Sequence, residues 1–181
     1  VAADDGAGKL ALARSIAGAD DGGQMLVRLV AEQARKRYSA LHVAARVAQV
    51  LDDLGGWTHR DCAGWYADYA ALCAKRYGDR VRRWATFNEF SVFTLFGYAF
   101  DWNAPGVVDK AANLQAIHHV NLAHGMGVDV IRDLVPEASI GAIHNRQRVW
   151  PEKDTDADRA AAALLDEHWN RAFPDPQLTG C

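Results

Sequence analysis

From residue 58 onward, helix-type and strand-type patterns alternate along the chain, and this alternation most strongly limits the folds available to it. The patterns predict helices from Thr58 to Gly78, at 110–133 and from Thr155 to about Asn170, with strands at 81–87 and 139–145. Strands that alternate with helices favour a parallel sheet, because each crossover returns the chain along the sheet in the same direction. The predicted fold class is therefore α/β and helix-rich.

The first part of the chain carries weaker signals. Residues 1–24 are small, acidic and glycine-containing. Gln24–Leu54 predicts one or two helices, because apolar residues recur at helical spacing, and Gly55-Gly56 ends that stretch. No parallel strand is expected at 38–44. The chain does not begin with Met and shows no signal-peptide pattern, so we expect its true start to lie elsewhere.

Composition excludes several classes of partner. A net charge of -3 and an isoelectric point near 6.2 give no electrostatic basis for binding nucleic acid or an anionic membrane. No apolar run approaches the roughly 18 residues of a membrane span. Cys62 and Cys73 share one predicted helix but lie about 16 Å apart along its axis, too far for a disulfide. Reduced thiols predict a cytoplasmic location.

The segment Trp84-Ala-Thr-Phe-Asn-Glu89 is the strongest candidate for chemistry. It is a short apolar strand that delivers an amide and a carboxylate at its carboxyl end. In a (β/α) barrel, catalytic residues lie at that end of the strands. From spacing alone, the simpler interpretation is that Asn88 and Glu89 open an ordinary loop, so other motifs must decide.

Those other motifs are present. The segment is similar to the signature Thr-(Phe/Leu/Ile)-Asn-Glu-Pro of the family 1 glycoside hydrolases, and further segments resemble that family in the same order. They are Asp53-Leu-Gly-Gly-Trp57, Tyr77-Gly-Asp-Arg80, Gly97-Tyr98, Ala104-Pro-Gly106, Leu122-Ala-His-Gly125, Ile140-Gly141 with Asn145, Pro151 and Phe173-Pro-Asp-Pro176. An ordered set is far more specific than any one motif. The resemblance covers about residues 49–180, which divides the chain into an unmatched segment at 1–48 and a partial barrel at 49–181.

The resemblance implies a retaining β-glycosidase of the β-glucosidase type, built on a (β/α)8 TIM barrel. Glu89 would be the general acid that protonates the glycosidic oxygen and then the base that activates water. Asn88 would hydrogen-bond the sugar 2-hydroxyl. The resemblance implies no metal or cofactor, and its partner is a β-glucoside or related small glycoside. Retaining chemistry also needs a nucleophilic carboxylate about 5–5.5 Å from the acid.

The sequence departs from the family pattern in three places. The Thr/Ser-Glu-Asn-Gly motif that carries the nucleophile is absent. Ala44 and Ala45 stand where the family has His and Trp. Phe90 replaces the proline after the glutamate, which leaves the following loop less rigid.

These departures shape the expected function. A barrel needs eight strands and typically about 250 residues, so we expect this sheet not to close and the isolated chain to be inactive. The alternatives are a non-catalytic α/β fragment or binding module, and a truncated product without native function. Its oligomeric state stays open.

Two further residues are candidate substrate contacts. Trp102 lies in the loop 98–108 on the expected active face, where an indole could stack on a sugar ring. Asn145 ends the second strand on the same rim as Glu89 and could line the aglycone subsite, although a strand-end amide that caps a loop is equally plausible. The spacing of His118, His119 and His124 does not suit metal ligation on a helix, so core or capping roles are favoured.

Overall fold

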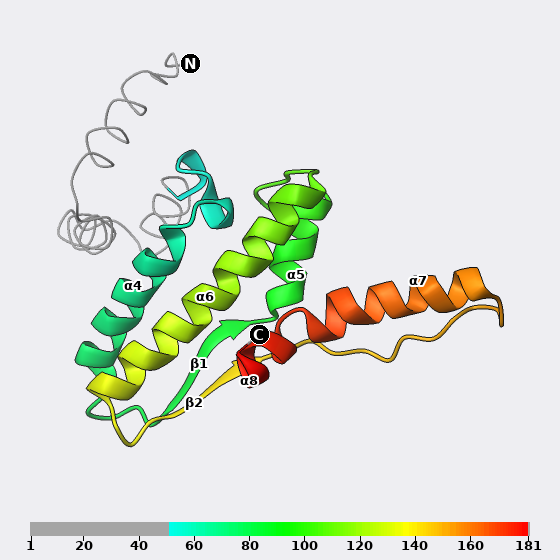
Figure 1. Cartoon of the computed structure of the whole chain (residues 1–181). Coiled ribbons are helices and arrows are strands. Elements are labelled where there is room, and N and C mark those ends of the chain that lie inside the picture. Colours follow the sequence, from blue (N-terminus) through cyan, green and yellow to red (C-terminus); the bar gives the residue numbers. More distant parts are fainter. Residues whose placement is uncertain (1–50, 181) are drawn as a thin grey trace, which may run out of the picture.

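A computed structural model describes residues 51–180 (Figure 1). The expected helices at 24–54 and the expected absence of a strand at 38–44 therefore lie almost wholly outside the described residues. The elements are η1 (Gly56–Thr58), α4 (Cys62–Tyr77), β1 (Arg83–Asn88), α5 (Phe90–Thr94), η2 (Leu95–Ala99), α6 (Lys110–Leu134), β2 (Ser139–Ile143), α7 (Asp156–Asp166), η3 (Glu167–Arg171) and α8 (Pro174–Thr179). The predicted order of helix, strand, helix, strand and helix is confirmed for α4, β1, α6, β2 and α7. The short elements α5, η2, η3 and α8 are additional, and α7 ends at Asp166 rather than near Asn170.

The two strands form a parallel pair. Arg83 lies opposite Ser139 and Trp84 lies opposite Ile140. Between Ala85 and Asn88, near the carboxyl end of the pair, an irregularity shifts the register. Helices α4 and α6 run side by side across this sheet, as Figure 1 shows. Between residues 51 and 180 the sheet has only these two strands, so the α/β prediction holds with an open sheet.

The helices pack on the sheet through a core of small and aliphatic side chains. Ala70 and Ala74 of α4 meet Ile131 of α6, and Val135 follows at the end of α6. The helices approach closely because Gly127 carries no side chain: a Cβ there would lie 2.7 Å from the Tyr66 ring. The Tyr66 hydroxyl donates a hydrogen bond of 2.5 Å to the Thr86 carbonyl, which ties α4 to β1.

The ends of α4 differ in part from the prediction. The helix begins at Cys62 rather than Thr58, and Asp61 caps it without a side-chain hydrogen bond. The Thr58 hydroxyl instead donates to the Gly55 carbonyl at 2.6 Å, because the chain makes a tight turn at Gly55 with φ of 96°. Gly78 ends the helix as predicted, but in a right-handed conformation. Glycine is required there because a side chain would collide with Val135 and the Ala74 carbonyl.

A short helical unit, α5 followed by the π-helical turn η2, lies between β1 and the loop 98–108. The backbone N–H of Trp57 donates to the Tyr98 hydroxyl at 2.8 Å, which joins η2 to η1. Asp109 caps α6 by accepting hydrogen bonds from Ala111 N and Ala112 N at 2.7 and 3.3 Å. The loop 98–108 is therefore followed by a helix with a well-formed N-cap.

Beyond β2 the chain forms an arm, which we define as the extended segment 144–155 together with α7. Figure 1 shows α7 projecting away from the sheet, with the extended segment running alongside it. Thr155 caps α7 as predicted, accepting a hydrogen bond from Asp158 N at 3.1 Å. Helix α7 has no buried residue. None of the helices in residues 51–180 is long and apolar enough to cross a membrane.

Candidate active site

The carboxyl ends of β1 and β2 meet at the segment that the sequence singled out. Asn88 is the last residue of β1 and pairs with Ile143, the last residue of β2. The next N–H, that of Glu89, donates to the Ile143 carbonyl at 2.8 Å. The Asn88 side chain is exposed and Glu89 is partly exposed. Both polar groups are thus open to a ligand at the end of the sheet where barrel enzymes place their chemistry.

Glu89 adopts a left-handed backbone conformation, with φ of 53° and ψ of 61°. It is the one non-glycine residue with positive φ between residues 51 and 180. This conformation costs an L-residue roughly 1–2 kcal/mol, so the surrounding structure must hold it. Such outliers concentrate at active sites and ligand clamps. The Glu89 carbonyl also accepts a hydrogen bond of 2.9 Å from Val92 N as α5 begins.

Phe90 follows Glu89 and is completely buried. Its ring lies 5.0 Å from the His144 ring at an interplanar angle of 18°, in a stacked arrangement. It also contacts the Phe173 ring at a centroid distance of 5.0 Å and the Phe87 ring at 5.1 Å. The expected loop after Glu89 is therefore helix α5, whose first residue is anchored in a cluster of aromatic rings.

A chain of side-chain hydrogen bonds surrounds this cluster. His144 Nε2 donates to Gln177 Oε1 at 3.1 Å, and Gln177 Nε2 donates to Asn121 Oδ1 at 3.2 Å. Asn121 Nδ2 in turn donates to the Ala172 carbonyl at 3.0 Å. The chain connects the end of β2 with α8 and α6, which come from distant parts of the sequence.

The surroundings of two histidines in the site lower their pKa values. Burial lowers the pKa of His124, and the neighbouring His144 lowers it further. Burial also lowers the pKa of His144, against the opposing effect of its hydrogen bond with Gln177, while nearby Arg146 lowers it. His124 Nδ1 and the Thr86 hydroxyl are 2.7 Å apart. His124 is therefore a partly buried residue that joins α6 to β1.

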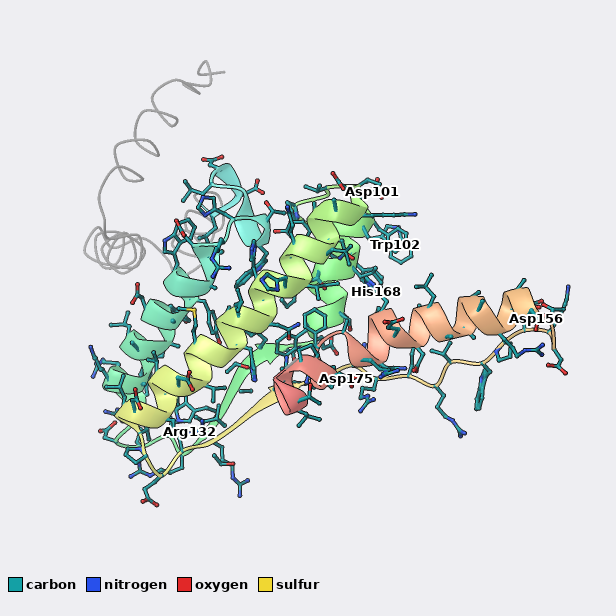
Figure 2. The ribbon with its side chains drawn as sticks, viewed as in Figure 1. Asp101, Trp102, Arg132, Asp156, His168 and Asp175 are labelled. Atoms are coloured by element: carbon teal, nitrogen blue, oxygen red, sulfur yellow. The ribbon has the colours of Figure 1, made fainter. Side chains whose placement is uncertain are left out.

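The other predicted residues lie at different distances from this centre. Asn145 is exposed and comes two residues after the end of β2, so it leaves the same edge of the sheet as Glu89. Trp102 is 69% exposed and stacks on Phe100 with ring centroids 5.1 Å apart. Figure 2 shows it beside Asp101 at the outer end of the α5–η2 unit. The structure thus joins Asn88, Glu89 and the segment of Asn145, while Trp102 belongs to an outlying aromatic group.

Sequence reasoning missed Phe90 and His144 as members of the site. His144 directly precedes Asn145 at the end of a predicted strand, and that position was the available signal. The contact between the two rings has no signal in the sequence, because it joins residues 54 positions apart.

A second feature is a hollow of about 470 Å³ between the extended segment and the base of α7, lined by Arg146, Gln147, Arg148, Val149, Trp150, Asp166 and Asn170. The Arg148 guanidinium lies 4.4 Å from the centre of the Trp150 ring. Asn170 closes the hollow at its base, because its amide donates to the Gln147 carbonyl and to Asp166 Oδ1, both at 2.7 Å. In the described part of the chain, no group of three or more His, Cys, Asp or Glu side chains could hold a metal ion.

The sequence of this chain was compared with protein families and with known proteins. The model of the family described as glycosyl hydrolase family 1 matches residues 27–181. The match starts ahead of residue 49, so part of the segment 1–48, which was expected to be unmatched, lies inside it. The β-glucosidase of an Agrobacterium species is 37% identical over 145 residues, which are 80% of this chain and 31% of that protein. The 6-phospho-β-glucosidase GmuD of Bacillus subtilis is 32% identical over 72% of this chain and 28% of its own length.

Solved structures are also similar to this chain. The virulence factor SghA of Agrobacterium tumefaciens is similar with a TM-score of 0.70 and 37% identity, over 74% of this chain and 30% of SghA. A complex of SghA with its substrate analogue salicin gives a TM-score of 0.67 over 70% of this chain and 28% of that one. The chain spans about a third of the length of the relatives that it matches.

Proposed function

Because this chain belongs to glycosyl hydrolase family 1, we propose that it is part of a retaining β-glycosidase and that Glu89 is the acid/base residue of that enzyme. The observation that carries the proposal is the position of Glu89. It follows the last residue of β1, in a left-handed turn tied to the end of β2. We also propose that the open parallel pair, with α4 and α6 on it, is a section of a (β/α)8 barrel, whose catalytic residues lie at this end of the strands.

The proposed mechanism assigns Glu89 two successive proton transfers. As a carboxylic acid it donates its proton to the glycosidic oxygen while a second carboxylate attacks the anomeric carbon and the aglycone leaves. As a carboxylate it then takes a proton from the water that hydrolyses the glycosyl-enzyme. Asn88 is exposed at the same strand end, so its amide is available to bind the sugar 2-hydroxyl.

The nucleophile must come from polypeptide that this sequence does not include. No Thr/Ser-Glu-Asn-Gly motif is present in the 181 residues. A retaining enzyme needs the second carboxylate about 5–5.5 Å from the first. We therefore propose that the isolated chain forms no productive complex with a glycoside and does not hydrolyse it.

We propose a β-glucoside or a related small glycoside as the substrate. Support comes from the β-glucosidase relative and from SghA, which was solved with its substrate analogue salicin. Asn145, at the same sheet edge, would line the aglycone side. Trp102 would contact a sugar only at the outer part of the site, because its ring lies in the group formed with Phe96 and Phe100.

The proposal is tested in a complete family 1 protein that carries this segment. Glu89→Gln should lower the hydrolysis of cellobiose by about 10²–10⁴-fold, because its aglycone needs protonation to leave. Azide should restore turnover of substrates whose leaving groups need no proton. Glu137→Gln is the matched control, since Glu137 is exposed in the turn before β2, at the opposite end of the strand. Full cellobiose hydrolysis by Glu89→Gln would contradict the assignment.

The isolated chain provides a separate test. Residues 1–181 should show no turnover of p-nitrophenyl β-glucoside after purification from host glycosidases. Turnover that persists in the purified chain and disappears in Glu89→Ala would mean that another carboxylate of this sequence serves as nucleophile.

A further inference from the structure

The left-handed turn at Glu89 is fixed on both of its sides. On the strand side, Asn88 pairs with Ile143 and the Glu89 N–H donates to the Ile143 carbonyl at 2.8 Å. On the helix side, the Phe90 carbonyl accepts a hydrogen bond of 2.8 Å from the buried Thr94 hydroxyl. Because the strand residue before Glu89 is held in place, any change in φ or ψ of Glu89 would have to move the Phe90 ring.

The Phe90 ring occupies a site built from four other parts of the chain. It contacts Phe87 of β1, His124 of α6, His144 after β2 and Phe173 before α8. Phe90 and Phe173 are 0% and 1% exposed. Moving Glu89 into the right-handed or extended region would swing this ring out of its site, so burial of Phe90 opposes relaxation of the turn.

His144 is the stacked neighbour of that ring and is itself held from behind. Its Nε2 donates to Gln177, which is bonded to Asn121 of α6. Its backbone continues directly from Ile143, the residue whose carbonyl receives the Glu89 N–H. The end of β2 and the residue that follows it therefore contact the turn twice, once through the Ile143 backbone and once through the His144 ring.

We infer that Phe90 and His144 form a positioning pair for Glu89. The stacked rings hold the left-handed turn and so fix the direction in which the glutamate leaves the sheet. Neither ring acts on the substrate itself. This inference rests on the proposed acid/base role of Glu89, but the conformation of the turn can be measured without any catalytic activity.

The experiment uses the labelled 181-residue chain and two nuclear magnetic resonance readouts at Glu89. The first is a strong intraresidue NOE between the amide and α protons, which is characteristic of positive φ. The second is the exchange rate of the Glu89 amide, which is protected by the Ile143 carbonyl. Phe90→Leu and His144→Ala should each weaken the NOE and speed amide exchange by about tenfold or more.

Two matched variants separate positioning from general packing. His144→Phe keeps a flat ring against Phe90 and should retain both wild-type readouts. Phe93→Leu changes a partly buried ring on the same helix that contacts Trp57 and Phe87, and it should also leave both unchanged. Because His144 is half-buried, His144→Ala decides the matter if Phe90→Leu fails to fold.

The inference is overturned if His144→Ala folds and keeps the wild-type NOE and exchange rate. It is also overturned if Phe93→Leu or His144→Phe loses them to the same degree as His144→Ala, because the effect would then be general. A failed acid/base assignment gives a different result: Glu89→Gln in the complete enzyme stays active while the Glu89 turn still responds to His144→Ala.

Discussion

The sheet with α4 and α6, which we call the packed unit, contrasts with the arm formed by 144–155 and α7. Helix α6 buries seven of its residues and α4 buries six. Helix α7 buries none, and Leu164 and Trp150 are 68% and 63% exposed. Apolar side chains on one face of α6 therefore contribute to stability, whereas those on α7 contribute little in this chain. An amphipathic pattern alone does not say whether a partner surface is present.

The sharpest test of this contrast is a pair of aliphatic truncations on the two helices. Ile131→Ala on α6 should lower the free energy of unfolding by about 2–5 kcal/mol, because it leaves a cavity beside Ala70 and Ala74. Leu164→Ala on α7 should change it by no more than about 0.5 kcal/mol. Urea denaturation followed by circular dichroism measures both, and equal losses would show that α7 is packed in solution.

A smaller effect is expected at the base of the arm. Asn170 is buried and makes three hydrogen bonds, two with the Gln147 backbone and one with Asp166. Asn170→Ala leaves those groups without their partner and should cost about 1–3 kcal/mol. Hydrogen exchange should speed up in the arm before it does so in α6. Asn103→Ala in the exposed loop is the control, and a uniform increase across both regions would refute this order of opening.

The close approach of α4 and α6 can be tested with two glycines of the same helix. Gly127→Ala should destabilise the packed unit by about 1–3 kcal/mol, because the new methyl group meets the Tyr66 ring. Gly125→Ala has nothing within 4 Å of its Cβ and should stabilise α6 by about 0.5–1 kcal/mol. Thermal unfolding of the two variants gives the sign of each change, and equal signs would contradict the packing described.

The smallest expected effect is a dependence of stability on pH that arises in the packed unit. The pKa of His124 is lowered below 6.5, first by burial and then by His144. The unfolded chain therefore binds a proton at His124 more readily than the folded chain does. The free energy of unfolding is consequently highest above about pH 6.5 and decreases as the pH falls below that value. The melting temperature should decrease between about pH 7.5 and 5.5. The decrease should be smaller in His124→Gln. His118→Gln is the control, because His118 is exposed, and it should show the wild-type decrease.

Local patterns in the sequence were sufficient for the order of the elements. The 3.6-residue spacing predicted α6 within one residue at its end, and Thr155 marked the start of α7. The strand before Glu89 was predicted at 81–87 and lies at Arg83–Asn88. The ordered motifs of the chain pointed to the family that the comparisons confirm. These features depend on neighbours a few residues apart, which the sequence displays directly.

Other features required contacts between distant residues. Thr58 resembled a helix cap, but the turn at Gly55 engages its hydroxyl, so α4 starts four residues later. Phe90 stands where the family has proline, and the sequence indicated a less rigid loop. In the structure Phe90 opens helix α5 with its ring buried against His144. A proline fixes a turn through its own ring, whereas a phenylalanine does so only when other elements supply the surface.

The sequence by itself determined which residues stand at the strand ends, because Asn88, Glu89 and Asn145 follow strand patterns that can be read locally. The tertiary structure decided how they are presented. The parallel register of β1 and β2 brings the Ile143 carbonyl to the Glu89 N–H and His144 to Phe90, and these contacts hold Glu89 at positive φ. A left-handed glutamate costs free energy locally, so only packing among residues far apart in the chain can make it the stable state.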